Sequence, residues 1–195
     1  VAFTSVFKNN GNETFTRIQL PSAHTAAGVW LDSDNDGDLD LVYHDAATTS
    51  TLYRNDGNDT FTSITGVFTT YTSWNPVAVD INNDNRMDLF FPNSSTQSSS
   101  LTRALYINNG NNTFALNSTS PLVTDVLTSD RGASFADIDN DGDYDALIVN
   151  GNVTEHRFYI NDGAGNFTSQ TSTAILGESL VGGRGSAFAD YNNDG

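Results

Sequence analysis

An acidic loop begins four times along this chain, and three of the copies run to completion. All copies carry Asp at positions one and five, Asp or Asn at position three, and Gly or Asn at position six. The complete copies are Asp32–Asp40, Asp80–Asp88 and Asp137–Asp145, and the fourth begins at Asp190. Oxygen side chains at this spacing favour a hard cation that takes many oxygen ligands, so Ca²⁺ is the first hypothesis.

The loop differs from an EF-hand, which requires a bidentate Glu at position 12. That position is Tyr43 in the first copy and Ile148 in the third. The last carboxylate comes instead at position nine, directly before β-branched and aromatic residues such as Leu41–Tyr43. Such runs are typical of strands, so the cation is predicted to lie in a turn between two strands.

The residue at position six is expected to let the backbone curl. Gly37 and Gly142 permit a positive φ, and Asn85, which replaces Gly in the second copy, tolerates one well. Such Asp/Asn/Gly clusters also form ordinary turns. Three complete copies in equivalent contexts favour the metal interpretation over that alternative.

A second motif repeats in phase with the loops. An aromatic residue is followed by a turn that contains Asn-Gly or Asp-Gly, and a Phe stands four residues after the Gly, which is typical of β-hairpins. These motifs are Phe7–Phe15, Tyr53–Phe61, Tyr106–Phe114 and Tyr159–Phe167. In the first complete repeat, strands are expected at 26–32, 40–45, 50–55 and 61–65.

Units of roughly 50 residues with four short strands are typical of β-propeller blades. The predicted fold is therefore all-β, a β-propeller segment with three full blades and partial blades at both ends. The expected blade ranges are 1–20 (partial), 21–66, 67–120, 121–173 and 174–195 (partial). Because propellers usually have four to eight blades, the chain is expected to be a fragment of a larger ring, with a closed four-bladed ring as the alternative.

The motif Gly-x-x-Phe-Ala-Asp-x-Asp-x-Asp-Gly-Asp-x-Asp, followed by Tyr-x-Asn-x-Gly-x-x-x-Phe, resembles the VCBS or FG-GAP-like repeats. These are related to the calcium-bearing blades of integrin α-subunit propellers. The resemblance covers nearly the whole chain, but the literal Phe-Gly and Gly-Ala-Pro pieces are missing, so integrin-like ligand binding does not carry over.

The resemblance implies Ca²⁺ as the cofactor and supplies a ligand set, in which the residue at position seven contributes its backbone carbonyl. The implied metal residues are Asp32, Asp34, Asp36, Asp38 and Asp40 in loop one, Asp80, Asn82, Asp84, Arg86 and Asp88 in loop two, Asp137, Asp139, Asp141, Asp143 and Asp145 in loop three, and Asp190, Asn192 and Asp194 in the incomplete loop four. Loop two is expected to be the weakest site because it has fewer carboxylates and an Arg.

Composition restricts the partners. The net charge is −16, with 24 acidic and 8 basic residues, so nucleic-acid binding is not expected. The sequence has no Cys to form disulfides. No apolar run approaches the roughly 18 residues that a membrane-spanning helix needs, so no transmembrane segment is expected in this chain.

Seven Asn-x-Ser/Thr sequons make the chain a candidate glycoprotein: Asn12, Asn58, Asn93, Asn111, Asn117, Asn152 and Asn166. No catalytic residue is predicted, because no nucleophile elbow or phosphate loop is present. The histidines His24, His44 and His156 are interpreted as edge or surface residues, and Trp30 and Trp74 as core residues in preference to a sugar-binding surface.

The expected function is an extracellular or cell-surface module, stabilised by calcium, that acts in adhesion, scaffolding or structural assembly without catalysis. Its expected partners are proteins or glycans at the surface, or further copies of itself. The alternatives are the propeller domain of a carbohydrate-active enzyme and a lectin-like module that binds sugar.

Overall fold

The structure is a computed structural model of the 195-residue chain. It describes residues 4–20, 27–44, 50–69, 75–92, 103–125, 130–151, 156–170, 183 and 185–192. Five residues with a sequence-based prediction lie outside the described residues: His24, Trp74, Asn93, Asn152 and Asp194.

The described chain is all-β, with four antiparallel sheets and a single helical turn, α1. In each sheet the strands pair in chain order, so each sheet is a meander. The elements are β1 (Ser5–Asn9) and β2 (Phe15–Gln19); β3 (Gly28–Leu31), β4 (Asp40–Tyr43), β5 (Thr51–Asn55) and β6 (Phe61–Ile64); β7 (Val77–Val79), β8 (Asp88–Phe91), β9 (Ala104–Gly110) and β10 (Thr113–Asn117); α1 (Pro121–Thr124); and β11 (Asp130–Ala136), β12 (Asp145–Asn150), β13 (Arg157–Ile160) and β14 (Thr168–Gln170).

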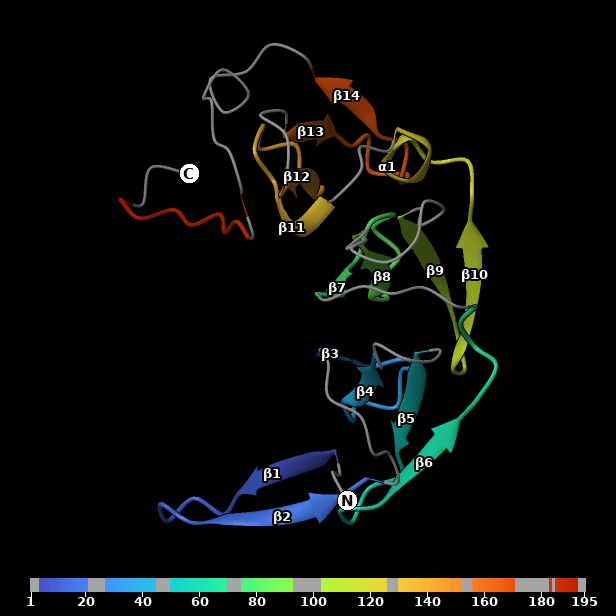
Figure 1. The fold of residues 1–195 in the computed structure, drawn as a ribbon, viewed down its shortest axis with the longest axis vertical. Helices are drawn as coiled ribbons and strands as arrows, with labels where there is room; N and C mark the ends of the chain where they lie inside the picture. The colour runs from blue at the N-terminus through green and yellow to red at the C-terminus, as the bar shows by residue number, and fades with distance from the viewer. Residues whose placement is uncertain are drawn as a thin grey trace.

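The sheets follow one another along an arc (Figure 1). The first strand of each four-stranded sheet lies toward the open side of the arc, and the fourth strand lies at its outer rim. The inner strands touch across the sheet junctions, where β7 contacts both β3 and β11. The two-stranded hairpin β1–β2 lies at one end of the arc, and residues 185–192 lie beyond the sheet β11–β14 at the other end. The three four-stranded sheets are called the first, second and third sheets below. This arrangement is a β-propeller-like repeat fold.

The second strand of each four-stranded sheet (β4, β8 and β12) is buried along its whole length. Successive side chains on a strand point in opposite directions, so such a strand packs on both of its faces. In β8, Leu89 and Phe91 pack toward the sheet before it, while Phe90 packs toward the sheet after it. Strand β12 divides its side chains in the same way, with Ile148 on one side and Val149 on the other. The continuous apolar runs of the sequence therefore supply both neighbouring cores.

Three of the aromatic-turn motifs begin in the third strand of a four-stranded sheet, and the fourth begins in β1. The tyrosines that open the three motifs, Tyr53, Tyr106 and Tyr159, are buried between sheets. Each turn closes on a Gly with positive φ, such as Gly57 at 74° and Gly110 at 77°. This is the conformation that Gly adopts without a steric cost.

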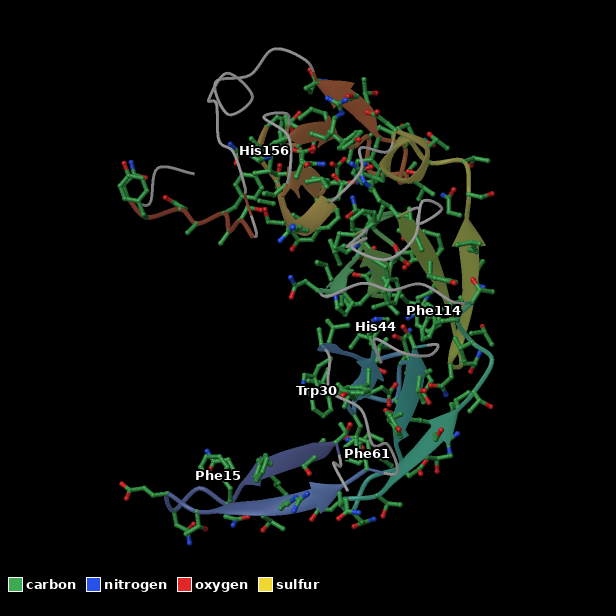
Figure 2. All side chains as sticks on the ribbon, viewed as in Figure 1. Phe15, Trp30, His44, Phe61, Phe114 and His156 are labelled. Carbon is green, nitrogen blue, oxygen red and sulfur yellow. The ribbon has the colours of Figure 1, made fainter. Side chains whose placement is uncertain are left out.

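Three residues differ from the sequence interpretation. His44 and His156 are buried, not at the surface. His44 Nδ1 lies 3.1 Å from the Ser50 hydroxyl, and His156 Nδ1 accepts a hydrogen bond of 3.2 Å from the Asn150 amide. Both imidazoles therefore satisfy polar groups next to a strand end. Trp30 is 42% exposed and is not a core residue, because it lies on the face of β3 that looks toward the two-stranded hairpin (Figure 2).

A buried ion pair joins the second four-stranded sheet (β7–β10) to the third (β11–β14). The Arg103 guanidinium donates from Nε to Asp130 at 2.7 Å and from Nη1 to the Tyr159 hydroxyl at 2.9 Å, and both charged side chains are almost fully buried. Asn150 donates to the second Asp130 oxygen at 3.1 Å. The low local dielectric makes such a network costly to break from one side.

We expect Arg103→Met to lower the free energy of unfolding by about 3–5 kcal/mol, because it leaves the Asp130 carboxylate buried without its cation. Chemical denaturation measures this change. Adding Asp130→Leu to Arg103→Met should recover part of the loss. The control is Arg54→Met, which removes the exposed ion pair with Asp56 and should change stability little. Equal losses for Arg54 and Arg103 would contradict this account.

Candidate metal centres

Each acidic loop connects the first and second strands of a four-stranded sheet, and its first Asp closes the loop on itself. In loop one, Asp32 accepts hydrogen bonds from the backbone amides of Asp36 at 3.2 Å and Gly37 at 3.0 Å. Asp80 and Asp137 accept the equivalent pairs in loops two and three. The carboxylate at position one therefore fixes the backbone at positions five and six.

The Asp at position nine is buried in all three loops: Asp40, Asp88 and Asp145 have no exposed surface. One oxygen accepts the amide at position two, and the other accepts an amide at the end of the third strand. For Asp40 these donors are Ser33 at 2.9 Å and Asn55 at 2.8 Å. The same two bonds recur at Asp88 and Asp145. This residue ties the loop to the adjacent hairpin.

The backbone of each loop curls because two of its residues adopt the left-handed conformation, with positive φ. Gly37 and Gly142 have φ of 92° and 95°, and Asn85 has φ of 64°, which confirms the predicted role of position six. Position four is also left-handed, at Asn35, Asn83 and Asn140. This second position was not predicted from the sequence, although Asn at position four of every loop was the signal.

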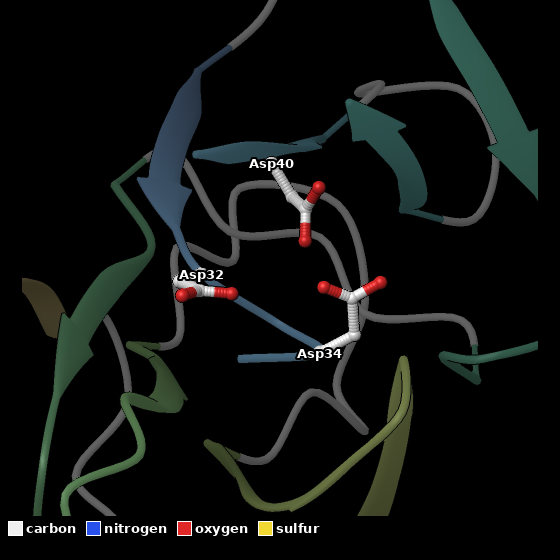
Figure 3. A group of neighbouring side chains, drawn as sticks. All are labelled: Asp32, Asp34 and Asp40. Atoms are coloured by element: carbon white, nitrogen blue, oxygen red, sulfur yellow. The ribbon is translucent and has the colours of Figure 1, made fainter. Parts of the chain in front are cut away.

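The curl brings together the carboxylates at positions one, three and nine. One oxygen from each of Asp32, Asp34 and Asp40 lies within 4.8 Å of the others, and Figure 3 shows the three side chains pointing into a common space. Loop three groups Asp137, Asp139 and Asp145 in the same way. These acidic clusters could hold a metal ion.

The carboxylate at position five has a different partner. Asp36 and Asp141 each accept the backbone amide of position seven, at 2.9 and 3.2 Å, and neither belongs to the converging groups. The predicted role of the position-seven carbonyl as a ligand stays a prediction. The Asp143 side chain at that position is buried beside the cluster, whereas that of Asp38 is exposed.

Loop two has the same backbone bonds but a different charge. Position three is Asn82, and the Arg86 guanidinium pairs with Asp84 through Nη2. Arg86 Nε also donates to the Asn108 carbonyl at 2.8 Å, which anchors the cation beside the loop. Loop two therefore has fewer carboxylates than loops one and three, and one of them, Asp84, is paired with Arg86.

Several loop oxygens are buried without a hydrogen-bond donor among the described residues: Asp34 Oδ1, Asn82 Oδ1 and Asp143 Oδ1. A buried acceptor without a donor costs free energy, and native structures usually supply a partner, such as a protein group, an ordered water or an ion. One such oxygen in each loop fits a cation that takes oxygen ligands. These unpaired oxygens support a cation site in each loop, and this support is independent of the sequence spacing.

Burial and nearby negative charges raise the pKa values of four loop carboxyls. Burial raises the pKa of Asp88 to about 6, against two backbone hydrogen bonds that lower it. Burial, followed by the charges of Asp141 and Asp145, raises the pKa of Asp143 to about 6. The pKa values of Asp40 and Asp139 are also raised, chiefly by burial. A bound cation would reverse these shifts by favouring the charged forms.

The fourth loop is described only in part. Asp190 and Asn192 lie in the irregular segment 185–192, whereas the rest of the loop lies outside the described residues. This segment packs on the third sheet, where Phe188 adjoins the cluster of Leu147, Val149 and Phe158, and Ser186 bonds to Ser134 at 2.7 Å.

An Asn of the hairpin motif was interpreted only as a turn former, but it also supports the acidic loops. Asn55, Asn108 and Asn161 each donate a side-chain N–H to the carbonyl at position eight of the loop, at 3.2–3.3 Å. Their backbone amides bind the Asp at position nine. The Asn in each Tyr-x-Asn motif was the signal that could have revealed this role.

Repeated meander sheets with an acidic loop after each first strand define a class of β-propeller-like repeat proteins. The sequence profile of the FG-GAP-like repeat matches residues 32–91 and 137–195. These segments make up more than half of the chain, which therefore belongs to the FG-GAP-like repeat family and confirms the resemblance found in the sequence.

A search of curated proteins gave no match. Among solved structures, the chain is similar to a lectin of Agrocybe aegerita whose structure concerns recognition of non-reducing terminal N-acetylglucosamine. The TM-score is 0.59 at 18% identity, with 86% of this chain and 46% of that chain covered. At this identity the similarity shows the fold alone. The chain spans about half the length of that lectin.

In the presence of a chelator, we expect stability to fall as the pH rises from about 4 through 6. The folded pKa values of Asp88 and Asp143, about 6, exceed the ordinary value of 3.8, so the folded state binds more protons in this window. The stabilisation is complete below the unfolded pKa and is lost as the pH passes the folded pKa. Thermal unfolding across this range measures the effect.

Saturating Ca²⁺ should remove or invert this dependence, because metal binding requires deprotonated ligands. Asp88→Asn is the second test. It should flatten the pH dependence measured in chelator, whereas the exposed Glu13→Gln should leave it unchanged. A dependence in chelator that keeps its slope in Asp88→Asn would contradict the assignment to this carboxyl.

Proposed function

We propose that this chain is a calcium-stabilised β-propeller module that binds or scaffolds at the cell surface or outside the cell. The observation that supports it best is the convergence of three carboxylates in loops one and three, beside buried oxygens that lack a donor. Carboxylate and amide oxygens are the ligands that Ca²⁺ takes. Family membership supports the same proposal.

The role of the cation in this proposal is structural. When bound, Ca²⁺ would supply positive charge that offsets the repulsion among the loop carboxylates. Asp32, Asp34 and Asp40 would hold it in loop one, and Asp137, Asp139 and Asp145 in loop three. In loop two, Asp80, Asn82 and Asp88 stand at the same positions. Each loop would then hold the first two strands of its sheet at a fixed angle to the hairpin.

The module would form part of a closed ring. Three meander sheets with their first strands toward the open side of an arc fit successive propeller blades (Figure 1). The sheet β7–β10 buries apolar side chains against the sheets on both sides of it, so further sheets could continue the arc by the same packing.

The proposed location is extracellular, where Ca²⁺ is abundant enough to fill sites of modest affinity. The sequon residues Asn12, Asn58 and Asn111 are exposed at equivalent hairpin turns, where glycans could be attached. The proposed activity is binding and not catalysis, because the described loop carboxylates serve to close the loops. Within the described residues, no helix has the length and apolar character to cross a membrane.

We expect Ca²⁺ to raise the melting temperature and a chelator to lower it, because a ligand that binds only the folded state stabilises that state by mass action. Asp34→Asn and Asp139→Asn should each remove part of this calcium-dependent increase. Differential scanning calorimetry measures the shift, and isothermal titration gives the number of sites. Loop two is expected to be the weakest.

Glu13→Gln is the matched control, since it removes one exposed charge outside the loops. It should leave the calcium-dependent shift unchanged. A melting temperature that is the same in excess Ca²⁺ and in excess chelator would refute the proposed role of the metal.

Carbohydrate binding is the second candidate function, and a groove favours it. The groove has a volume of about 520 Å³ and lies between the hairpin β1–β2 and the first four-stranded sheet. Trp30 and Phe61 line it with their rings 6.2 Å apart, and Asp38 and Asn55 add polar groups. Aromatic rings beside carboxylate and amide groups suit a sugar, which has both apolar and hydroxyl surfaces.

Titration with N-acetylglucosamine oligomers, followed by tryptophan fluorescence, tests this candidate. We expect a saturable change that Trp30→Ala abolishes and that Leu116→Ala, an exposed apolar change on β10, leaves intact. A panel of other glycans should follow if this sugar fails. The absence of saturable binding across the panel would exclude the candidate function and leave the calcium proposal untouched.

A further inference from the structure

The turn of each hairpin carries a left-handed residue two positions after its Gly. These residues have φ between 60° and 79°, and they are Glu13, Asp59, Asn112 and Gly165. The first two place a carboxylate at this position, and Gly165 places no side chain there. Among the four, only Asn112 supplies an amide side chain, which can both donate and accept hydrogen bonds.

Asn112 reaches from the second sheet into loop one of the first sheet. Its backbone amide donates to the Ser33 carbonyl at 3.1 Å, and its Nδ2 donates to Asp34 Oδ2 at 2.9 Å. Its Oδ1 lies 2.5 Å from the Ser33 hydroxyl, which also bonds to Asp40. Ser33 and Asp40 are fully buried. One amide side chain is therefore linked to the carboxylates at positions three and nine of loop one.

The bond from Asn112 separates the two oxygens of Asp34 into two roles. Oδ2 accepts from Asn112, whereas Oδ1 is buried without a donor among the described residues. A donor on one oxygen fixes the orientation of the carboxylate, and outer partners of this kind orient metal ligands. Figure 3 shows the Asp34 side chain pointing toward the space that it shares with Asp32 and Asp40. Oδ1 is therefore the oxygen that Asp34 would offer to a cation.

The second junction provides a natural comparison, because Gly165 occupies the equivalent position over loop two. A β-carbon at Gly165 would lie 3.4 Å from the Ile81 side chain and 3.7 Å from the Asn82 β-carbon. Gly165 thus faces positions two and three of loop two, as Asn112 faces those of loop one. Asn82 Oδ1 is buried and has no donor among the described residues. Loop two therefore lacks the amide that Asn112 supplies to loop one.

On the basis of the calcium function proposed above, we propose that Asn112 is a positioning residue for the cation of loop one. The second sheet supplies it across the junction. Asn112 acts through Asp34, whose Oδ1 it leaves available, and through Ser33, which bonds to Asp40. Because coupling between two equilibria is reciprocal, a cation in loop one also strengthens the contact between the first and second sheets.

Asn112→Gly tests the proposal, since Gly removes the amide side chain but suits the left-handed backbone, as it does at Gly165. Calcium binding is measured by isothermal titration in the Asp139→Asn background, in which loop three is weakened. We expect Asn112→Gly to lower the calcium affinity of loop one by at least about tenfold. Asn111→Gly is the matched control, because it removes an exposed amide side chain at the adjacent left-handed residue. It should leave the affinity unchanged.

Asp34→Asn identifies the site and separates positioning from a general loss of stability. Loop one is the site whose calcium affinity this substitution lowers. Adding Asn112→Gly should then lower the affinity little further, because Asn112 acts mainly through Asp34. A residue needed only for packing would instead lower the melting temperature in chelator and leave the calcium affinity of the folded protein unchanged. That result would overturn the proposal.

Hydrogen exchange followed by NMR measures the reciprocal effect. The Asn112 backbone amide donates across the junction to Ser33, so saturating Ca²⁺ should slow its exchange by about tenfold, the same factor as the change in affinity. Asp34→Asn should reduce this protection. Calcium binding in loop one that Asn112→Gly leaves unchanged, or that falls equally in Asn111→Gly, overturns the role of Asn112 alone. A wild-type chain that binds no calcium overturns the proposed calcium function as well.

Discussion

The buried Asp at position nine of each loop is the residue on which the repeat depends. Asp40, Asp88 and Asp145 each bind one amide at the start of the loop and one at the end of the third strand. A single side chain therefore fixes the turn between the first two strands and its distance from the hairpin. A buried carboxylate is stable only when its oxygens have partners, which explains why an Asn amide always lies opposite it.

The same interaction links the acidic loops to the packing between sheets. The Asn that binds position nine also shapes the hairpin turn, and the turn then meets the loop of the preceding sheet. Loop, hairpin and neighbouring loop thus form one chain of contacts along the arc. A change in one acidic loop would therefore act on its own sheet and on the junction with the next sheet.

Part of the candidate site could be read from the sequence. Position six could be predicted because few residues accept a positive φ, and the spacing of loop and hairpin motifs predicted meander sheets with four strands. Position five could not be assigned from spacing, since whether Asp36 faces the cluster or its own backbone depends on the closed loop. The sequence also did not predict that His44 and His156 are buried and that Trp30 is exposed, because these properties depend on which sheet lies opposite each residue.

The sequence by itself determined the repeat, the strand order within each sheet and the family, because these follow from local spacing and turn chemistry. Only the tertiary structure decided which oxygens converge, which lack a donor among the described residues, and which loop meets which hairpin turn. Convergence requires the curl set by two left-handed residues in each loop, such as Asn35 and Gly37. The contacts between a loop and the hairpin turn of the next sheet join residues about 80 apart in sequence, such as Ser33 and Asn112. Local sequence cannot encode such contacts one by one, because each requires the sheets on both sides to be in place.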